Sequence, residues 1–125
     1  MKIVLRTQSE QPIYAQIKDQ IREQILSGQI PEGTVLPSIR ALAREIGVSV
    51  ITTTRAYSDL EQEGFIASIQ GKGTLVLSRN NALVREQYLK RIEEGLSAAI
   101  ETARSAEVSR EEFMAILDAL WQSME

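Results

Sequence analysis

The sequence predicts a mostly helical α+β protein, with a winged helix-turn-helix followed by a short pair of helices. Two helical patterns meet at a tight corner, Gly47 to Ser49, and an alternating pattern with a glycine-rich tip follows at Phe65 to Leu77. Two apolar helical stripes then occupy residues 81–125. We therefore expect a winged helix-turn-helix domain at residues 1–78 and a helical tail at residues 79–125.

Composition excludes several classes of function. With no cysteine and no histidine among 125 residues, the chain offers no disulfide framework and none of the usual zinc sites. It lacks both a secretory leader pattern and an apolar run of about 18 residues, so we expect a cytoplasmic protein without a membrane partner. The net charge is −3. Residues 1–79 carry nine Lys/Arg and eight Asp/Glu, a net +1, whereas residues 80–125 carry five and nine, a net −4.

The first expected helix starts at Pro12. Apolar residues recur every four positions from Ile13 to Ile25, separated by polar residues such as Gln16, and Gly28 follows the last turn. This spacing predicts an amphipathic helix with one buried stripe and the glutamine on its polar side. The preceding residues 1–11 contain a short apolar alternation that fits either a minor strand or a loose arm.

Two further helices flank the corner. Ser38 is a suitable N-cap for a helix from Ile39 to about Ile46, and Ser49 for a helix over residues 50–63. The latter begins with a β-branched run, residues 50–54, that would also fit a strand. The caps at both ends favour a helix, whose buried face holds Thr53, Ala56, Tyr57 and Leu60, with Ile51, Thr54, Arg55 and Ser58 pointing away.

The hairpin and the tail complete the prediction. The hairpin strands lie at residues 65–69 and 74–77, with Lys72 at the tip, and Thr34 to Leu36 fits a very short additional strand. A long helix is expected from about Asn81 to Arg104, and Ser109 with Glu112 forms a capping box for a last helix. These two helices are too apolar to cover one another alone, so we expect a contact with the first domain or with a second copy.

Four motifs occur in a specific order: PSxRxLA from Pro37, VS at Val48, AYxxLExEG from Ala56 and GxGT from Gly71. Together they resemble the GntR superfamily of bacterial transcription regulators over residues 12–77. Residues 80–125 resemble the short two-helix tail of its YtrA-like branch. The resemblance implies a sequence-specific DNA-binding regulator, namely a homodimeric repressor of a near-palindromic operator, associated in this branch with transporter operons. It implies no cofactor, and the chain contains no catalytic constellation, so we predict no enzyme activity.

The expected partners are double-stranded DNA, a second copy of the chain and an unidentified small-molecule effector. The predicted DNA-contacting residues are Ser38, Arg40, Arg44, Ser49, Val50, Ile51, Thr52, Thr54, Arg55, Gly71 and Lys72. The predicted dimer-interface residues are Tyr88, Leu89, Ile92, Leu96, Phe113, Ile116, Leu117, Leu120 and Trp121.

Some of these positions leave alternatives open. Arg55 fits either a DNA contact or an ion pair with Asp59, four residues on. Val50 and Ile51 depart from the family pattern, in which polar residues are usual, so contacts with thymine methyl groups are expected there instead of hydrogen bonds. The same apolar pair and the net negative charge also fit a winged-helix module that binds protein and not DNA.

Overall fold

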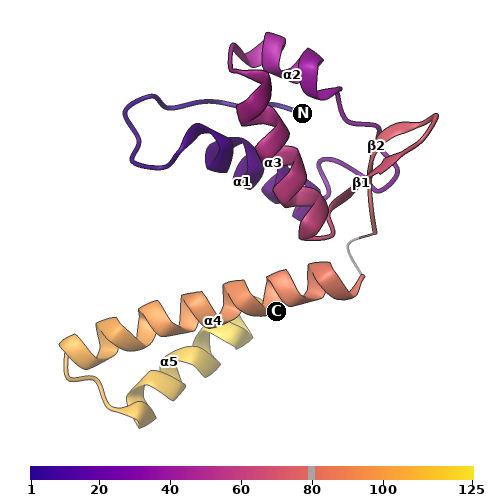
Figure 1. Cartoon of the computed structure of the whole chain (residues 1–125). Coiled ribbons are helices and arrows are strands. Elements are labelled where there is room, and N and C mark those ends of the chain that lie inside the picture. Colours follow the sequence, from indigo (N-terminus) through magenta and orange to yellow (C-terminus); the bar gives the residue numbers. More distant parts are fainter. Residues whose placement is uncertain (79–80) are drawn as a thin grey trace. The chain divides into compact units, whose positions relative to one another are not determined.

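The structure is a computed structural model that describes residues 1–78 and 81–125. The chain divides into two compact units, residues 1–87 and 88–125, and each is described by itself. The elements of the described residues (Figure 1) are α1 (Ile13–Leu26), α2 (Ile39–Ile46), α3 (Val50–Gln62), β1 (Ile66–Ile69), β2 (Gly73–Val76), α4 (Ala82–Ser105) and α5 (Arg110–Ser123). The predicted helices and hairpin are thus confirmed, with boundaries shifted by a residue or two.

The core of the N-terminal unit lies between α1, α2 and α3. The α1 stripe is buried at Ile17, Ile21 and Ile25, and Leu60 of α3 and Phe65 are fully buried with it. Burying one such side chain contributes about 1.5–3 kcal/mol relative to exposing it. The apolar residues whose spacing predicted the helices therefore also form the core that holds α3 against α1 and α2.

The β-branched start of α3 is helical because its threonine side chains bond back to the helix. Ser49 caps the helix, accepting a hydrogen bond from the Thr52 amide at 3.0 Å. The Thr53 hydroxyl donates to the Ser49 carbonyl at 3.1 Å, and the Thr54 hydroxyl to the Val50 carbonyl at 2.7 Å. These local bonds and the burial of Thr53 offset the low helix propensity of the run.

The wing is an antiparallel pair whose register runs from Ile66 opposite Val76 to Ile69 opposite Gly73. The expected short strand at residues 34–36 is present only as a bridge, Val35 with Leu75. The Leu36 amide donates to the Thr74 carbonyl at 2.8 Å. This bridge ties the segment before α2 to the wing, so α2 and the hairpin are held in one unit.

The N-terminal arm is neither the minor strand nor the loose arm that the alternation allowed. Three α1 glutamines, spaced four residues apart, each accept from the N–H and donate to the C=O of one arm residue, in the pairs Gln24 with Lys2, Gln20 with Val4 and Gln16 with Arg6. Four helical residues rise about 6.0 Å and two extended residues about 6.6 Å, so the two spacings match. The expectation that Gln16 faces solvent is wrong, because it is buried by this pairing.

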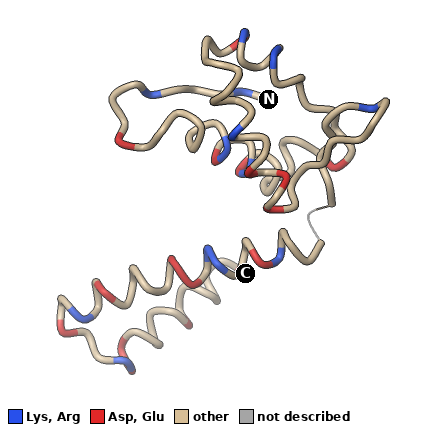
Figure 2. The backbone as a smooth tube through the Cα atoms, viewed as in Figure 1, with Lys and Arg blue, Asp and Glu red and all other residues tan. Residues whose placement is uncertain are grey.

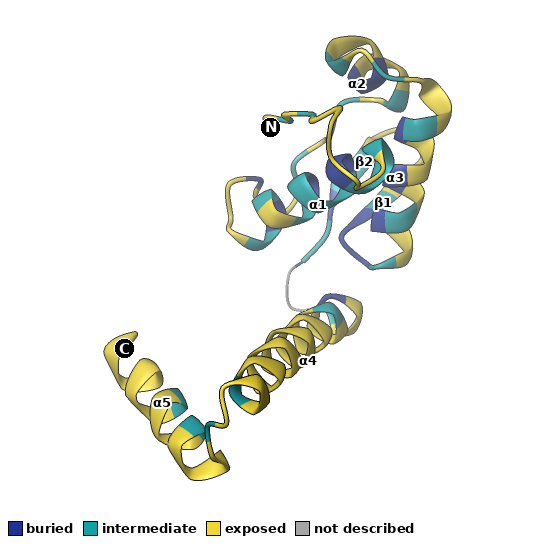
Figure 3. Ribbon diagram, turned by 90° about the vertical axis from the view of Figure 1, so that its left-hand side faces the viewer, coloured by how far each residue is buried: buried dark blue, intermediate teal, exposed yellow. Residues whose placement is uncertain are grey.

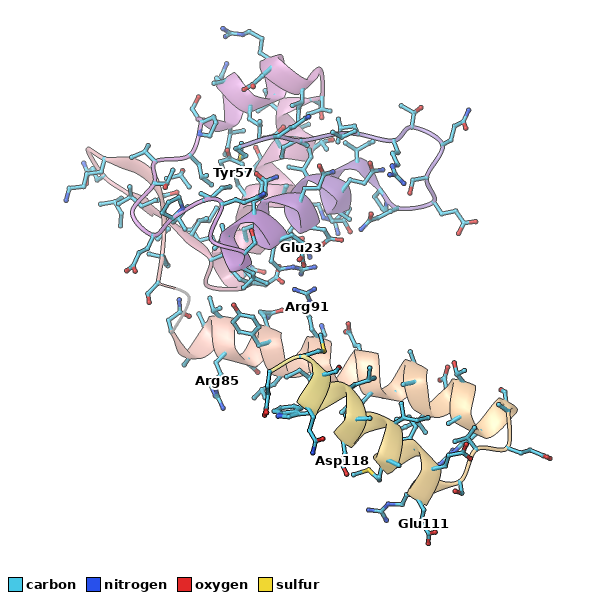
Figure 4. All side chains as sticks on the ribbon, turned by 180° about the vertical axis from the view of Figure 1, so that it is seen from behind. Glu23, Tyr57, Arg85, Arg91, Glu111 and Asp118 are labelled. Carbon is cyan, nitrogen blue, oxygen red and sulfur yellow. The ribbon has the colours of Figure 1, made fainter. Side chains whose placement is uncertain are left out.

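Tyr57 links α3 to the segment before α2. It lies inside the N-terminal unit (Figure 4), and its hydroxyl donates to the Pro37 carbonyl at 2.7 Å. Burial, and then the negative charge of Glu45, raise the pKa of this phenol to about 12. The folded state therefore favours the neutral phenol. The contribution of Tyr57 to the free energy of unfolding is complete below pH 10, the ordinary pKa of tyrosine, and it declines as the pH rises towards 12.

Tyr57→Phe is expected to lower the free energy of unfolding by about 1–3 kcal/mol at neutral pH, because it leaves the Pro37 carbonyl unpaired. The difference from wild type should shrink as the pH rises from 10 towards 12, by roughly 2–3 kcal/mol, because only the wild-type phenol ionises on unfolding. Urea denaturation across this pH range measures both effects. A difference that stays constant up to pH 12 would contradict the link between ionisation and stability.

The tail consists of most of α4 together with α5. Ser109 caps α5 by accepting from the Glu112 amide at 3.1 Å, which confirms the predicted N-cap. Among residues 88–125, all of which the structure describes, none is buried, and Figure 3 shows both helices exposed along most of their length. The helical hairpin therefore forms without a core of its own.

Candidate nucleic-acid interface

The second helix presents two cations to solvent. Ser38 accepts from the Ala41 amide at 3.1 Å and so begins α2, on which Arg40 and Arg44 are exposed one turn apart. Figure 2 shows blue segments, the colour of Lys and Arg, along α2. Neither arginine has an acidic partner within ion-pair distance in the described part of the chain. Both guanidinium groups are thus available to an anionic partner.

A sharp turn sets the direction of α3. Gly47 has φ 72° and ψ 38°, the left-handed conformation that glycine adopts without a steric penalty. The Val48 amide then donates to the Ala43 carbonyl at 3.0 Å. As a result, the chain leaves α2 and enters α3 within three residues, which is the helix-turn-helix geometry.

The N-terminus of α3 carries a suitable phosphate donor. The Ser49 hydroxyl accepts from the Thr52 amide and donates to Thr52 Oγ1 at 2.9 Å. The proton of Ser49 is therefore engaged, whereas that of Thr52 remains available to a ligand. Amides of the first helical turn have no partner within the helix, and they give this end a partial positive charge that favours phosphate.

The outward face of α3 is held by a contact with α1. The Arg55 guanidinium carbon lies 3.8 Å from the centre of the Tyr14 ring. Asp59 instead lies 4.0 Å from Lys18, so the stacked arrangement, and not the Arg55–Asp59 pair, is the one adopted. Stacking holds the cation through its face and leaves its edge free to donate hydrogen bonds. Sequence reasoning did not identify Tyr14, because this contact joins residues 41 positions apart.

The wing adds a fourth cation at the hairpin tip. Lys72 is exposed, and its amide donates to the Ile69 carbonyl at 3.0 Å. Gly71 and Gly73 have φ of 81° and 90°, so glycine is required there by the turn itself. The basic tip is visible in Figure 2.

Charge is segregated along α3. Its acidic residues, Asp59 and Glu61, lie in the C-terminal half. The C-cap residue Glu63 pairs with Lys18 at 3.4 Å and with Arg22 at 3.3 Å. Residues 49–58 contain no acidic residue. The N-terminal half of the helix is therefore locally positive, together with α2 and the wing tip, although the whole chain has a net charge of −3.

The predicted contact residues are accessible together. Ten of the eleven are exposed, and Thr52 is half-buried. They come from the start of α2, the corner, the first half of α3 and the wing tip. Their contact with DNA stays a prediction, because accessibility is necessary for it but does not test it.

The predicted dimer-interface residues are also mostly accessible. Seven of the nine are exposed in the single chain, including Ile92 at 55%, Leu120 at 55% and Trp121 at 68%, whereas Phe113 and Leu117 are half-buried. Sequence reasoning omitted Ile100 and Met114, which are equally exposed at 41%. Both belong to the apolar stripes, so helical periodicity alone could have identified them.

Two further features are absent from the part of the chain that the structure describes. The described residues contain no group of three acidic side chains placed to hold a metal ion. In the same part of the chain, every helix is too short or too polar to cross a bilayer.

The three-helix core, the sharp corner and the basic hairpin define this unit as a winged helix-turn-helix of the DNA-binding class. Residues 13–76 match the family described as "Bacterial regulatory proteins, gntR family". The chain belongs to this family, and it is accordingly a DNA-binding transcription regulator and not an enzyme.

Individual relatives agree with this assignment. The chain is 36% identical over 109 residues to the HTH-type transcriptional repressor YtrA of Bacillus subtilis (strain 168), covering 87% of this chain and 84% of that protein. A transcriptional antiterminator from Listeria monocytogenes EGD-e has a TM-score of 0.72 and 32% identity, covering 98% of this chain and 92% of the other. AraR(DBD) in complex with operator ORE1 has a TM-score of 0.50 and 34% identity, covering 61% of this chain and 93% of the other.

Proposed function

We propose that this chain is a homodimeric repressor that binds a near-palindromic operator, with the N-terminal half of α3 in the major groove and the wing beside it. The observation that carries the proposal is that α2, the acid-free first half of α3 and the wing tip each present exposed cations, namely Arg40, Arg44, Arg55 and Lys72. Recognition helices of this class contact bases through their N-terminal residues. The repressor role follows the similarity to YtrA of Bacillus subtilis.

The tail supports the homodimer. Ten large apolar side chains of residues 88–125 are at least 37% exposed in the single chain. A face of this kind is rarely left in water. The same face of a second copy, related to the first by a two-fold axis, would cover it. Two winged units related by that axis would bind two half-sites, which is why we expect an operator with inverted symmetry.

The decisive experiment is selection of genomic DNA fragments by the purified full chain, followed by a salt titration of binding to the selected duplex. Affinity should fall steeply with salt, because Lys and Arg contacts with phosphates release counterions. A winged helix that served only as a protein-binding module would show no such dependence, even on random duplex DNA. That outcome would support the alternative suggested by the exposed Ile51.

Arg40→Ala is expected to weaken operator binding by about 1–3 kcal/mol and to reduce the salt slope by about 1 if the contact is with phosphate. The side chain is exposed, so the melting temperature should not change. Lys90→Ala is a matched control, because it removes an exposed positive charge from α4. Titration by fluorescence anisotropy at several salt concentrations measures the operator affinity and the salt slope of wild type and of both variants. Equal affinity of the Arg40 variant and wild type would remove Arg40 from the interface.

A further inference from the structure

We propose that Ile51 is a specificity-determining residue that contacts the 5-methyl group of a thymine in each operator half-site. This inference rests on the proposed function, since it assigns one base contact of the same interface. Ile51 is 82% exposed, whereas no other large apolar side chain in the described part of residues 1–78 exceeds 57%. Such an exposed aliphatic side chain at the start of a recognition helix has no role in the core of this protein.

Helix geometry directs this side chain away from the core. Ile51 precedes the fully buried Leu60 by nine residues, which places the two about 180° apart around α3. It is also the second residue of the helix, at the end that enters the groove in this class of protein. Its branched alkyl group can neither donate nor accept a hydrogen bond.

The chemistry of the major groove leaves one partner for such a group. Among the groups that base pairs display there, the thymine methyl is the apolar one, and the others are hydrogen-bond donors and acceptors. The neighbouring Thr54 hydroxyl already donates to the Val50 carbonyl, so it does not offer the groove a free donor at this point. Ile51 thus distinguishes thymine from cytosine without a hydrogen bond.

The test compares the selected operator with duplexes in which thymine is replaced by deoxyuridine, which lacks only the methyl group. Burying one such carbon is worth about 0.8 kcal/mol, or roughly a four-fold change in affinity. At one position of the half-site sequence, replacing the thymine in both half-sites should therefore weaken wild-type binding roughly 16-fold, if the half-sites are independent. At that position Ile51→Ala should bind the thymine and deoxyuridine duplexes equally.

Two variants serve as matched controls. Val50→Ala truncates the neighbouring aliphatic side chain, which is 43% exposed, and Arg40→Ala removes a charge. Both should keep the wild-type sensitivity to deoxyuridine. Thermal melting of Ile51→Ala should match wild type, because the side chain is 82% exposed and is not part of the core.

The outcomes separate this inference from the proposed function. If wild type binds the operator in a salt-dependent manner but no deoxyuridine position weakens binding, the Ile51 contact is wrong and the repressor stands. If Ile51→Ala keeps the full deoxyuridine penalty, or Val50→Ala abolishes it, the methyl group is contacted by another residue. If wild type shows no salt-dependent DNA binding at all, the proposed function fails together with the inference.

Discussion

Gly64→Ala is expected to lower the free energy of unfolding of the N-terminal unit by about 2–5 kcal/mol. Gly64 has φ 87°, and a Cβ added there would lie 2.5 Å from the Leu83 Cβ and 3.1 Å from Asn81 Oδ1. The left-handed conformation costs an alanine about 1–2 kcal/mol, and forcing extra volume into a packed site costs about 1–3 kcal/mol more. The start of α4 must also move, because Asn81 donates to the Gly64 carbonyl at 3.0 Å and caps the Val84 amide at 2.9 Å.

Gly47→Ala provides the matched control for this prediction. Gly47 also has positive φ, at 72°, but a Cβ there would meet no atom within 4 Å. It should therefore cost only the backbone term, about 1–2 kcal/mol. Urea denaturation followed by circular dichroism measures the free energy of unfolding of both variants. Equal losses would show that the contact with Leu83 contributes nothing, and that Gly64 matters only as the end of α3.

The elements of the N-terminal unit were predictable because their determinants are local. Ser38 and Ser49 cap the helices that follow them, and Gly47 takes the left-handed conformation that the corner requires. The buried face of α3 also follows from its periodicity, since Thr53 and Leu60 are both fully buried. In each case the information lies within one helical turn of the residue concerned.

The N-terminal arm was not predictable, because its determinants are side chains that normally face water. A glutamine between apolar positions indicates a polar helix face, yet Gln16 is buried and bonds to both Arg6 and the Gln11 carbonyl. Its partner is extended backbone, which has no sequence signature of its own. The requirement for glycine at position 64 was likewise only partly predictable from the sequence, because its steric part depends on the contact with Leu83.

The candidate site shows the same division. The exposure of Arg40, Ile51 and Lys72 followed from helical and hairpin geometry. The stacking of Arg55 on Tyr14 did not, because it depends on how α3 lies against α1. The alternative pairing of Arg55 with Asp59 was equally compatible with the sequence. Only the packing of the helices distinguishes the two arrangements.

Leu120→Glu is expected to convert the proposed dimer to a monomer and to weaken operator binding roughly 10²–10⁴-fold, because the second half-site is then no longer bound by a tethered copy. Leu120 is 55% exposed in the single chain, so the change should leave the N-terminal unit folded. A glutamate in the dimer interface would lose its hydration without gaining a charged partner, which is costly. Because the tail has no core of its own, it has no other packing to offset this cost. Sedimentation at micromolar concentration measures the oligomeric state, and anisotropy measures operator affinity.

Gln122→Glu distinguishes an interface effect from a charge effect. It adds the same charge to α5 at another exposed position, about 200° around the helix from Leu120. This variant should remain dimeric and bind with nearly wild-type affinity, since its side chain lies on the polar side of the helix. If Leu120→Glu is also a dimer, or if wild type is a monomer at micromolar concentration, the apolar face of α5 does not join two copies. The source of operator symmetry would then have to lie in the winged unit itself.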